Sequence, residues 1–445
     1  MAMVEGPLVR NAASLYATTV VTSVLGFFYW FIAARMVPAA AVGTASAVQS
    51  AAQFLAIVCV LGLSTLLISE LSLDRTHARS LILSAACVSG LFSLVISVSL
   101  GIGLAIGGTS LQAGLTGPLR ILIFVILSVL STMLVVMDDA CVGLLRGDLQ
   151  LRRNAVFATS KLMVLPLLVL AWPTRTGSEL IVAWVIGLAI SLVTLSIGLG
   201  RLTHGTSWQL DFRRLFEKRR VIMGHHWLNL SVQSPRLIIP VLCATIVGPA
   251  ANAAYTAATL VVAFINIIPF HLSTVLFAIV PGDEVALRVE VKKTMTISLV
   301  LALVSAPFFV LCSNFILGLF GAEYQTAAPA MALLGLTTYP FAVKCHYVAI
   351  ARVKGKMEQA ALWTMIGATL EVGLAAEGGV LHGVTGVAAG LLIAMILEAA
   401  ILSPVVFGVL KAGRSPGFRG SLQSEVDESE QPRSKGGWSD PSSHE

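Results

Sequence analysis

A few charged side chains stand inside long apolar stretches of this chain, and their types and positions limit the chemistry available to it. A charge in hydrocarbon is expensive, so such a residue usually faces a water-filled cavity or pairs with an opposite charge. Lysine and arginine could bind phosphate or pyrophosphate there, and carboxylates could hold a coupling ion. The basic candidates are Lys161, Arg236 and Lys344, and the acidic candidates are Asp138, Asp139, Glu371 and Glu398.

The candidates of the first half lie on two consecutive apolar stretches. Counting about 1.5 Å per helical residue puts Asp138, Asp139 and Lys161 roughly 10–12 Å below the same membrane face. This matched depth predicts an ion pair across the hairpin, or a site where an ion competes for the carboxylates. A purely structural salt bridge is the alternative that these residues leave open.

The stretch that contains Arg236 is the most polar of the apolar stretches. Arg236 directly follows Pro235, and proline frees a backbone carbonyl and tends to kink a helix. We therefore expect this helix to line a water-filled cavity. Glu371 is expected at a depth similar to that of Arg236. Glu398 is expected near the bilayer centre, where it would suit proton coupling; a protonated Glu bonded to a neighbouring helix is the alternative. The other polar residues of the stretch are His225, His226, Asn229, Ser231, Gln233 and Ser234.

Motifs of known catalytic chemistry are absent from the sequence. There is no HExxH, no GxSxG and no P-loop. Adjacent His225 and His226 would point about 100° apart on a helix, and the six cysteines form no CxxC pair and no Cys/His metal spacing. We expect no enzymatic activity, no metal site and no cofactor beyond a coupling ion, Na⁺ or H⁺.

The composition shows which solvent surrounds these residues. Of 445 residues, 56% are hydrophobic and 12% are charged, whereas soluble domains carry about 25% charged residues. A chain of this size cannot bury that much apolar surface in water, so the class is an all-α polytopic membrane protein. The net charge of +6 is attributed to loops facing anionic lipid and not to nucleic-acid binding.

Apolar length predicts about twelve membrane spans, because each needs about 20 mostly apolar residues. Six precede residue 200 and six follow residue 222. The predicted spans are Ala12–Ile32, Val42–Leu67, Leu81–Ile106, Ile121–Leu145, Ala155–Trp172, Leu180–Leu199, Met223–Val247, Ala253–Val280, Met295–Leu317, Ala327–Ile350, Gln359–Ala376 and Gly386–Leu410.

Loop charges predict the orientation. The alternate connections that include the N-terminal tail hold 18 Lys and Arg residues, whereas the opposite set holds only Arg35, Arg120 and Arg175. Cytoplasmic loops carry the excess of Lys and Arg. Both termini are therefore expected to be cytoplasmic, and the location is expected to be a bacterial inner membrane.

These spans divide the chain into four regions. Residues 1–199 and 223–410 each form a predicted six-helix bundle. Residues 200–222 form a basic connector, in which Trp208, Phe212, Leu215 and Phe216 follow the spacing of an interfacial amphipathic helix on anionic lipid. Residues 411–445, rich in Ser, Gly, Pro and charge, are predicted to be a disordered cytoplasmic tail.

The two halves also show a weak repeat. Pro38-Ala39-Ala40 follows the first span of one half, and Pro249-Ala250-Ala251 follows the first span of the other. Each turn precedes a Leu-Ser-Thr segment by a similar distance. Internal repeats are common in transporters.

Several segments carry a family resemblance. The opening FFYWFIAARMVPAAAVGTASA, the GLLRG turn at 143–147 with Arg153-Asn154 and Lys161, and LFGAEY at 319–324 followed by Arg352 resemble polysaccharide-exporter proteins. In this order they are similar to the Wzx-like branch of the MOP flippase superfamily, which also holds MATE drug exporters and lipid II flippases. The likeness runs from about residue 8 to 410.

The resemblance implies two six-helix bundles around a central cavity, alternating access, and a polyprenyl-pyrophosphate-linked glycan as substrate. It implies that cavity bases engage the pyrophosphate and that acids couple to Na⁺ or H⁺. By position Arg35, Lys161 and Arg236 match the cavity bases best, although Arg35 would equally suit a place at the outer surface. Membrane lipids and a polysaccharide polymerase or glycosyltransferase are the expected partners.

These observations predict a flippase for a surface-polysaccharide precursor. A MATE-like exporter of cationic drugs is the nearest alternative, but it predicts acidic cavity walls. A membrane-embedded glycan-processing enzyme would need acidic or His motifs at an aqueous edge, which the sequence lacks. A non-transporting scaffold that recruits partners through its tail is the remaining alternative.

Overall fold

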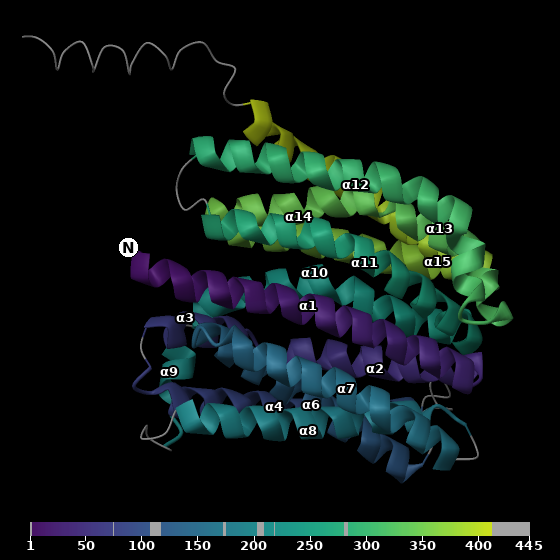
Figure 1. Cartoon of the computed structure of the whole chain (residues 1–445), viewed down its shortest axis with the longest axis horizontal. Coiled ribbons are helices and arrows are strands. Elements are labelled where there is room, and N and C mark those ends of the chain that lie inside the picture. Colours follow the sequence, from purple (N-terminus) through teal and green to yellow (C-terminus); the bar gives the residue numbers. More distant parts are fainter. Residues whose placement is uncertain are drawn as a thin grey trace, which may run out of the picture.

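The computed structural model is built from helices and describes residues 2–73, 75–106, 117–171, 175–202, 209–217, 219–279 and 284–411. Helices suit hydrocarbon because they satisfy every backbone polar group within one segment. Figure 1 shows the helices of the first half on one side of the molecule and those of the second half on the other. The predicted tail lies outside the described residues apart from Lys411, as does Trp208 of the connector.

The first half forms one bundle of long helices. Its second span is broken, because Leu61 and Gly62 have φ of 52° and 73° and so interrupt the helix. The predicted span Val42–Leu67 is therefore two helices set end to end. The elements are α1 (Ala2–Met36), α2 (Ala39–Cys59), α3 (Leu63–Leu73), α4 (Ala78–Ile106), α6 (Pro118–Gly143), α7 (Gly147–Ala171) and α8 (Ser178–Leu202).

The described part of the connector is attached to this first bundle. Its helix α9 (Phe212–Glu217) buries Leu215 in the same hydrophobic cluster as residues of α3, α4 and α6. The preceding Asp211 backbone N–H donates to Ser84 Oγ at 2.8 Å, and Ser80 Oγ donates to the carbonyl of Gln209. Phe212 of the same helix is exposed. This segment therefore packs on the first bundle through Leu215, one of the four apolar residues that were predicted to face lipid.

The second half forms the other bundle. Its last helix is very long but contains non-helical backbone at His382 and Gly383, where Gly383 takes φ of 59°. It is therefore two helices joined by a tight turn. The elements are α10 (Arg219–Ile246), α11 (Pro249–Ile279), α12 (Glu284–Gly318), the 3₁₀ helix η1 (Ala322–Ala327), α13 (Ala328–Leu336), α14 (Thr338–Val353) and α15 (Met357–Lys411).

The described helices account for the twelve predicted crossings. Nine of them are long and apolar enough to cross a membrane, and the bent pair α13–α14 adds a tenth. The turn in α15 divides that helix into two crossings. The helix α10 has 28 residues, but its polar face keeps it out of the apolar set. The prediction of an all-α membrane protein with two helical bundles is confirmed.

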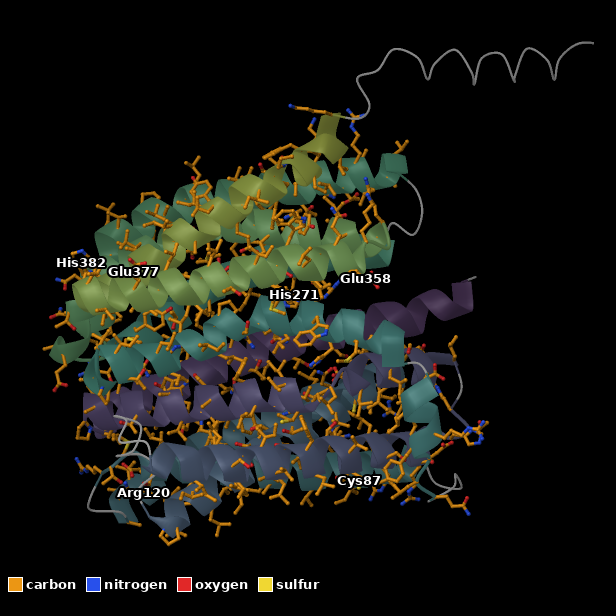
Figure 2. All side chains as sticks on the ribbon, turned by 180° about the vertical axis from the view of Figure 1, so that it is seen from behind. Cys87, Arg120, His271, Glu358, Glu377 and His382 are labelled. Carbon is orange, nitrogen blue, oxygen red and sulfur yellow. The ribbon has the colours of Figure 1, made fainter. Side chains whose placement is uncertain are left out.

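Opposite ends of the helices are visible in Figure 2. Glu377 and His382 lie at one end together with Arg120, and Glu358 lies toward the other end. The first leg of α15 therefore crosses the whole bundle. We call the end that holds Arg120 and His382 the outer end, because the loop charges predict that it faces outward.

The turns that follow the fourth crossing of each half have the same backbone. Leu145 and Gly355 both have positive φ, 56° and 67°. The amide of Arg146 bonds the carbonyl of Cys141 at 2.8 Å, and the amide of Lys356 bonds that of Ala351 at 2.9 Å. Lys161 in α7 and Glu371 in α15 lie the same number of residues beyond these two turns. The two halves therefore carry opposite charges at equivalent positions.

The two bundles meet along α2, α10 and α11. Gly43 of α2 packs so closely on the backbone of Pro249 that any side chain there would collide with the Pro249 carbonyl. Asn252 Nδ2 donates to the Gly43 carbonyl at 2.8 Å and to Ser46 Oγ at 2.9 Å. Ser46 and Thr256 are also in hydrogen-bond contact at 3.2 Å. The repeated Pro-Ala-Ala turns thus lie beside the main contact between the halves.

Candidate functional site

A buried triad of charges lies in the second bundle. Lys344 Nζ of α14 donates to Glu371 Oε1 at 2.8 Å and to Glu398 Oε2 at 2.9 Å. Glu371 belongs to the first leg of α15 and Glu398 to the second leg. All three residues are at most 5% exposed. The arrangement ties three crossings together through one ammonium group.

A glycine makes room for this triad. A Cβ at Gly367 would stand 2.2 Å from the carboxyl carbon of Glu398, which is far closer than two such atoms can approach. The two legs of α15 also pack backbone to backbone where Gly390 meets the Leu374 carbonyl. Small residues allow helices in membranes to approach closely. The position of the Glu398 carboxylate therefore depends on having no side chain at residue 367.

The charges of the triad do not balance. One ammonium stands between two carboxylates, so full ionisation leaves one excess negative charge in a buried place. Glu398 Oε1 is buried without a hydrogen-bond partner. An unpaired buried charge is strongly unfavourable, so one additional proton or cation belongs to this group.

Lys161 of the first bundle has entirely different surroundings. Its Nζ lies over three aromatic rings, at 3.9 Å from the ring centroid of Trp184, 4.6 Å from that of Phe157 and 4.9 Å from that of Tyr29. Tyr29 is held in place because its hydroxyl donates to the Leu180 carbonyl at 2.8 Å. The ring faces attract the ammonium electrostatically. We call Tyr29, Phe157 and Trp184 the aromatic cage.

The predicted ion pair between Lys161 and the aspartates is wrong. Asp138 pairs instead with Arg153, whose Nε donates to Asp138 Oδ1 at 3.1 Å and whose Nη2 contacts Oδ2. Asp139 lies beside Ser64. The error came from the helix boundary: α7 begins at Gly147 and not at Ala155, so Arg153 lies within the helix and Lys161 lies two turns deeper than predicted.

Arg153 is the site residue that the sequence analysis missed. The predicted spans leave Arg153 in the loop between Leu145 and Ala155, yet this residue is only 2% exposed. The available signal was the Gly147-Asp148 dipeptide, since glycine after a turn and an acid in the first helical turn mark a helix start. A helix that starts there places Arg153 level with Asp138.

Arg236 is an accessible cation on α10 of the second bundle. Its side chain is exposed, and its Nη2 donates to Gln233 Oε1 at 3.2 Å. Asn229 lies two turns earlier on the same face of α10, where it accepts from Arg352 Nη2 at 3.4 Å. Within the described residues, Arg236 has no carboxylate partner. This polar face of α10 is therefore free to meet an anion.

Arg35 lies at the outer end, where α1 finishes. Its Nε donates to the carbonyl of Leu319 at 2.8 Å, and its guanidinium lies 5.9 Å from the Phe31 ring centroid. Leu319 follows α12, so this bond joins the two bundles. Phe27 and Phe31 also pack edge-on against Phe320. The structure therefore places Arg35 in an exposed contact between the bundles.

The candidates thus fall into separate groups. The structure brings Lys344, Glu371 and Glu398 together. It places Lys161, Arg236 and Arg35 apart from the other candidates. Asp138 joins Arg153. Among the described residues, no three His, Cys, Asp or Glu side chains are grouped so that they could hold a metal ion. The roles in substrate binding and ion coupling remain predictions.

Comparisons with known proteins establish the fold. No family model matches the chain, and no curated protein matches it. A multidrug resistance MATE family transporter of the MOP superfamily in its inward-facing conformation matches with a TM-score of 0.63 and 16% identity, covering 90% of this chain and 100% of that one. The outward-facing conformation of such a transporter gives a TM-score of 0.60 at 16% identity, over 92% and 96% of the chains.

A further solved structure is a MOP superfamily transporter from Pyrococcus furiosus, described by a binding pocket of reverse polarity that suggests a different function. It gives a TM-score of 0.59 at 16% identity, over 91% of this chain and 96% of that one. The chain therefore has the fold of MATE transporters of the MOP superfamily along nearly its whole length. The Wzx-like branch is not distinguished by these matches.

Proposed function

We propose that the protein is an alternating-access transporter that moves a polyprenyl-pyrophosphate-linked oligosaccharide, or a related surface-polysaccharide precursor, across the bacterial inner membrane. The observation that carries the proposal is an accessible arginine, Arg236, without a carboxylate partner on the polar face of α10. An anionic ligand needs such a donor where water is excluded. The fold supports transport, because similar chains are known in inward-facing and outward-facing conformations.

The proposed roles of the basic residues follow their accessibility. Arg236 binds the pyrophosphate, with Gln233 and Asn229 on the same face of α10 completing a polar surface. Lys161 contributes positive potential from inside the aromatic cage. Lys344 is bound by two carboxylates and is therefore assigned to ion coupling. Arg35 joins the two bundles at the outer end, and we assign it to closure of that end.

The proposed coupling group is the triad of Lys344, Glu371 and Glu398. Its buried charges leave one negative charge to be balanced, which is the property that an ion-coupled transporter needs. Asp138 is satisfied by Arg153, which makes this acid a less suitable place for a coupling ion than the triad. The expected partners are the lipid-linked glycan, membrane lipids and a polysaccharide polymerase or glycosyltransferase.

An exporter of cationic drugs is the second candidate, because the fold is shared with multidrug resistance transporters. A cationic drug needs carboxylates or open aromatic faces in its cavity. In the first bundle, the aromatic cage is already occupied by Lys161 and Asp138 is paired with Arg153. These contacts favour an anionic substrate over a cationic one.

Reconstitution into proteoliposomes tests the proposal. Labelled polyprenyl-pyrophosphate glycans should move between leaflets in the presence of the protein, and an ion gradient should change the rate. Efflux of a cationic drug without movement of any such lipid would select the second candidate. Absence of both activities from correctly folded protein would contradict transport itself.

The variant Arg236→Ala sharpens this test. Losing one charge-assisted hydrogen bond to the pyrophosphate costs about 1.5–3 kcal/mol, which corresponds to roughly 10–100-fold in transport. Arg201→Ala is the matched control, because Arg201 is exposed in the last turn of α8. Equal transport by the two variants would remove Arg236 from the substrate site.

A further inference from the structure

The centre of the Lys344–Glu371–Glu398 triad is already filled by a cation. The ammonium stands between two carboxylate oxygens at 2.8 and 2.9 Å, in the place where two facing carboxylates would otherwise hold a metal ion. An ammonium is a compact charge with three donors, and two of these donors are used by the carboxylates. A Na⁺ ion at this centre would have to displace Lys344 into the apolar bundle.

No second cation completes the balance within the described residues. Both carboxylates have Lys344 as their salt-bridge partner there. The Tyr255 hydroxyl of the neighbouring helix α11 interacts electrostatically with Glu371, and the Cys345 thiol of α14 interacts electrostatically with Glu398. The other described titratable or charged side chains on the helices around the triad are His226, Arg236 and Cys243 on α10, His271 on α11, Arg288, Glu290, Lys292, Lys293 and Cys312 on α12, Tyr339, His346, Tyr347 and Arg352 on α14, and Glu358, Glu377, His382 and Lys411 on α15.

Two of these neighbours are occupied elsewhere. Arg236 donates to Gln233. His346 contacts the Ala342 carbonyl at 2.8 Å and Thr294 at 3.1 Å. The remaining charge is therefore balanced most simply by one proton on the carboxylate pair, and Glu398 Oε1, which is buried without a partner, is an open position for it.

We propose that Lys344 is a built-in cation that replaces a metal ion in the second bundle, so that the triad excludes Na⁺ and exchanges a single proton. The proton comes from water and returns to water, converting one carboxylate to a carboxylic acid and back while Lys344 stays bound. The proposal rests on the proposed transport function for its use in coupling. Its binding chemistry can be measured without any transport.

Thermal unfolding of the purified protein in matched NaCl, KCl and N-methylglucamine chloride is the main test. The wild type should unfold at the same temperature in all three salts. Lys344→Met keeps the length of the side chain but vacates the centre, so Na⁺ should raise its unfolding temperature by a few °C over KCl. Lys161→Met is the matched control and should show no difference, because no carboxylate surrounds that lysine.

Two outcomes of the salt test would overturn the proposal. One is a specific stabilisation of the wild type by Na⁺ that disappears in Glu398→Gln, because this would show that the triad binds Na⁺ with Lys344 present. The other is a folded Lys344→Met that does not respond to Na⁺, because the lysine would then not occupy a cation position.

Infrared spectroscopy keeps the proposal testable if Lys344→Met does not fold. The wild type should show a carboxylic-acid C=O band that is lost in Glu398→Gln or Glu371→Gln, and the absence of any such band across the pH range of the folded protein would contradict the shared proton. Failure of lipid movement with these results intact would reject the proposed function alone. Transport driven by Na⁺ would reject this inference alone.

Discussion

Lys161 and Lys344 are equally buried, yet the two bundles stabilise them in opposite ways. Lys344 is held by two carboxylates in a group with excess negative charge. Lys161 is held by the faces of three aromatic rings, without a carboxylate partner in the described part of the chain. Ring faces stabilise a cation without adding a carboxylate, so they bring no negative charge to the site. The first bundle therefore keeps a positive charge, whereas the second keeps a group that can change its charge.

The internal repeat makes this difference more informative. Lys161 stands in one half where Glu371 stands in the other, after turns with matching hydrogen bonds. The same place in the fold thus attracts an anion in one bundle and binds a cation in the other. We interpret this as a division between a lasting positive charge in the first bundle and a group that can change its charge in the second.

The largest expected effect comes from breaking the triad. In a potassium medium, Lys344→Met should lower the free energy of unfolding by about 3–5 kcal/mol, because two carboxylates lose their buried partner. Thermal or denaturant unfolding in detergent measures the loss. The triple variant Lys344→Met, Glu371→Gln, Glu398→Gln removes all the charges and should recover much of it. A triple variant no more stable than the single one would show that the triad is not held together by charge.

A smaller effect should follow from a variant that changes the packing around the triad and keeps its charged side chains. Gly367→Ala places a methyl group where the carboxyl group of Glu398 lies, and such overpacking costs about 1–3 kcal/mol. The carboxylic-acid band should also shift, because the carboxylate must move. Gly187→Ala is the counterpart in the first bundle, where a Cβ would stand 3.1 Å from the Cβ of Lys161. An equal loss in both variants would show general helix packing and no special role for Gly367.

The twelve crossings could be predicted because apolar length and alternating loop charge are local properties of the sequence. Interruptions were harder to find. Leu61 and Gly62 lie within an apolar run, and the turn at His382–Gly383 joins two legs that pack directly on each other. Nothing in apolar length alone marks such breaks. Glu371 was expected at the depth of Arg236 and Glu398 near the bilayer centre, but their common partner Lys344 was not predicted.

The sequence shows which charged residues lie inside the helices, but it does not show which of them pair with each other. Pairing depends on where each helix begins and how it is rotated, and an error of two turns in α7 assigned Lys161 the partner that belongs to Arg153. The aromatic cage was also not predicted, because its rings come from three helices, α1, α7 and α8, and the sequence does not show how these helices are rotated. Gly367 has a role only because the second leg of α15 returns past it.

The smallest expected effect is that of Lys161→Met. Removing the ammonium forfeits a desolvated cation–π interaction of about 2 kcal/mol, but it also removes the cost of holding a charge in the bundle, and replacing a buried charge by a well-packed apolar side chain is often neutral. The free energy of unfolding should therefore change by no more than about 1 kcal/mol, measured beside Lys344→Met under the same conditions. A loss as large as that of Lys344→Met would mean that both lysines are held by carboxylates, and the contrast between the two bundles would then fail.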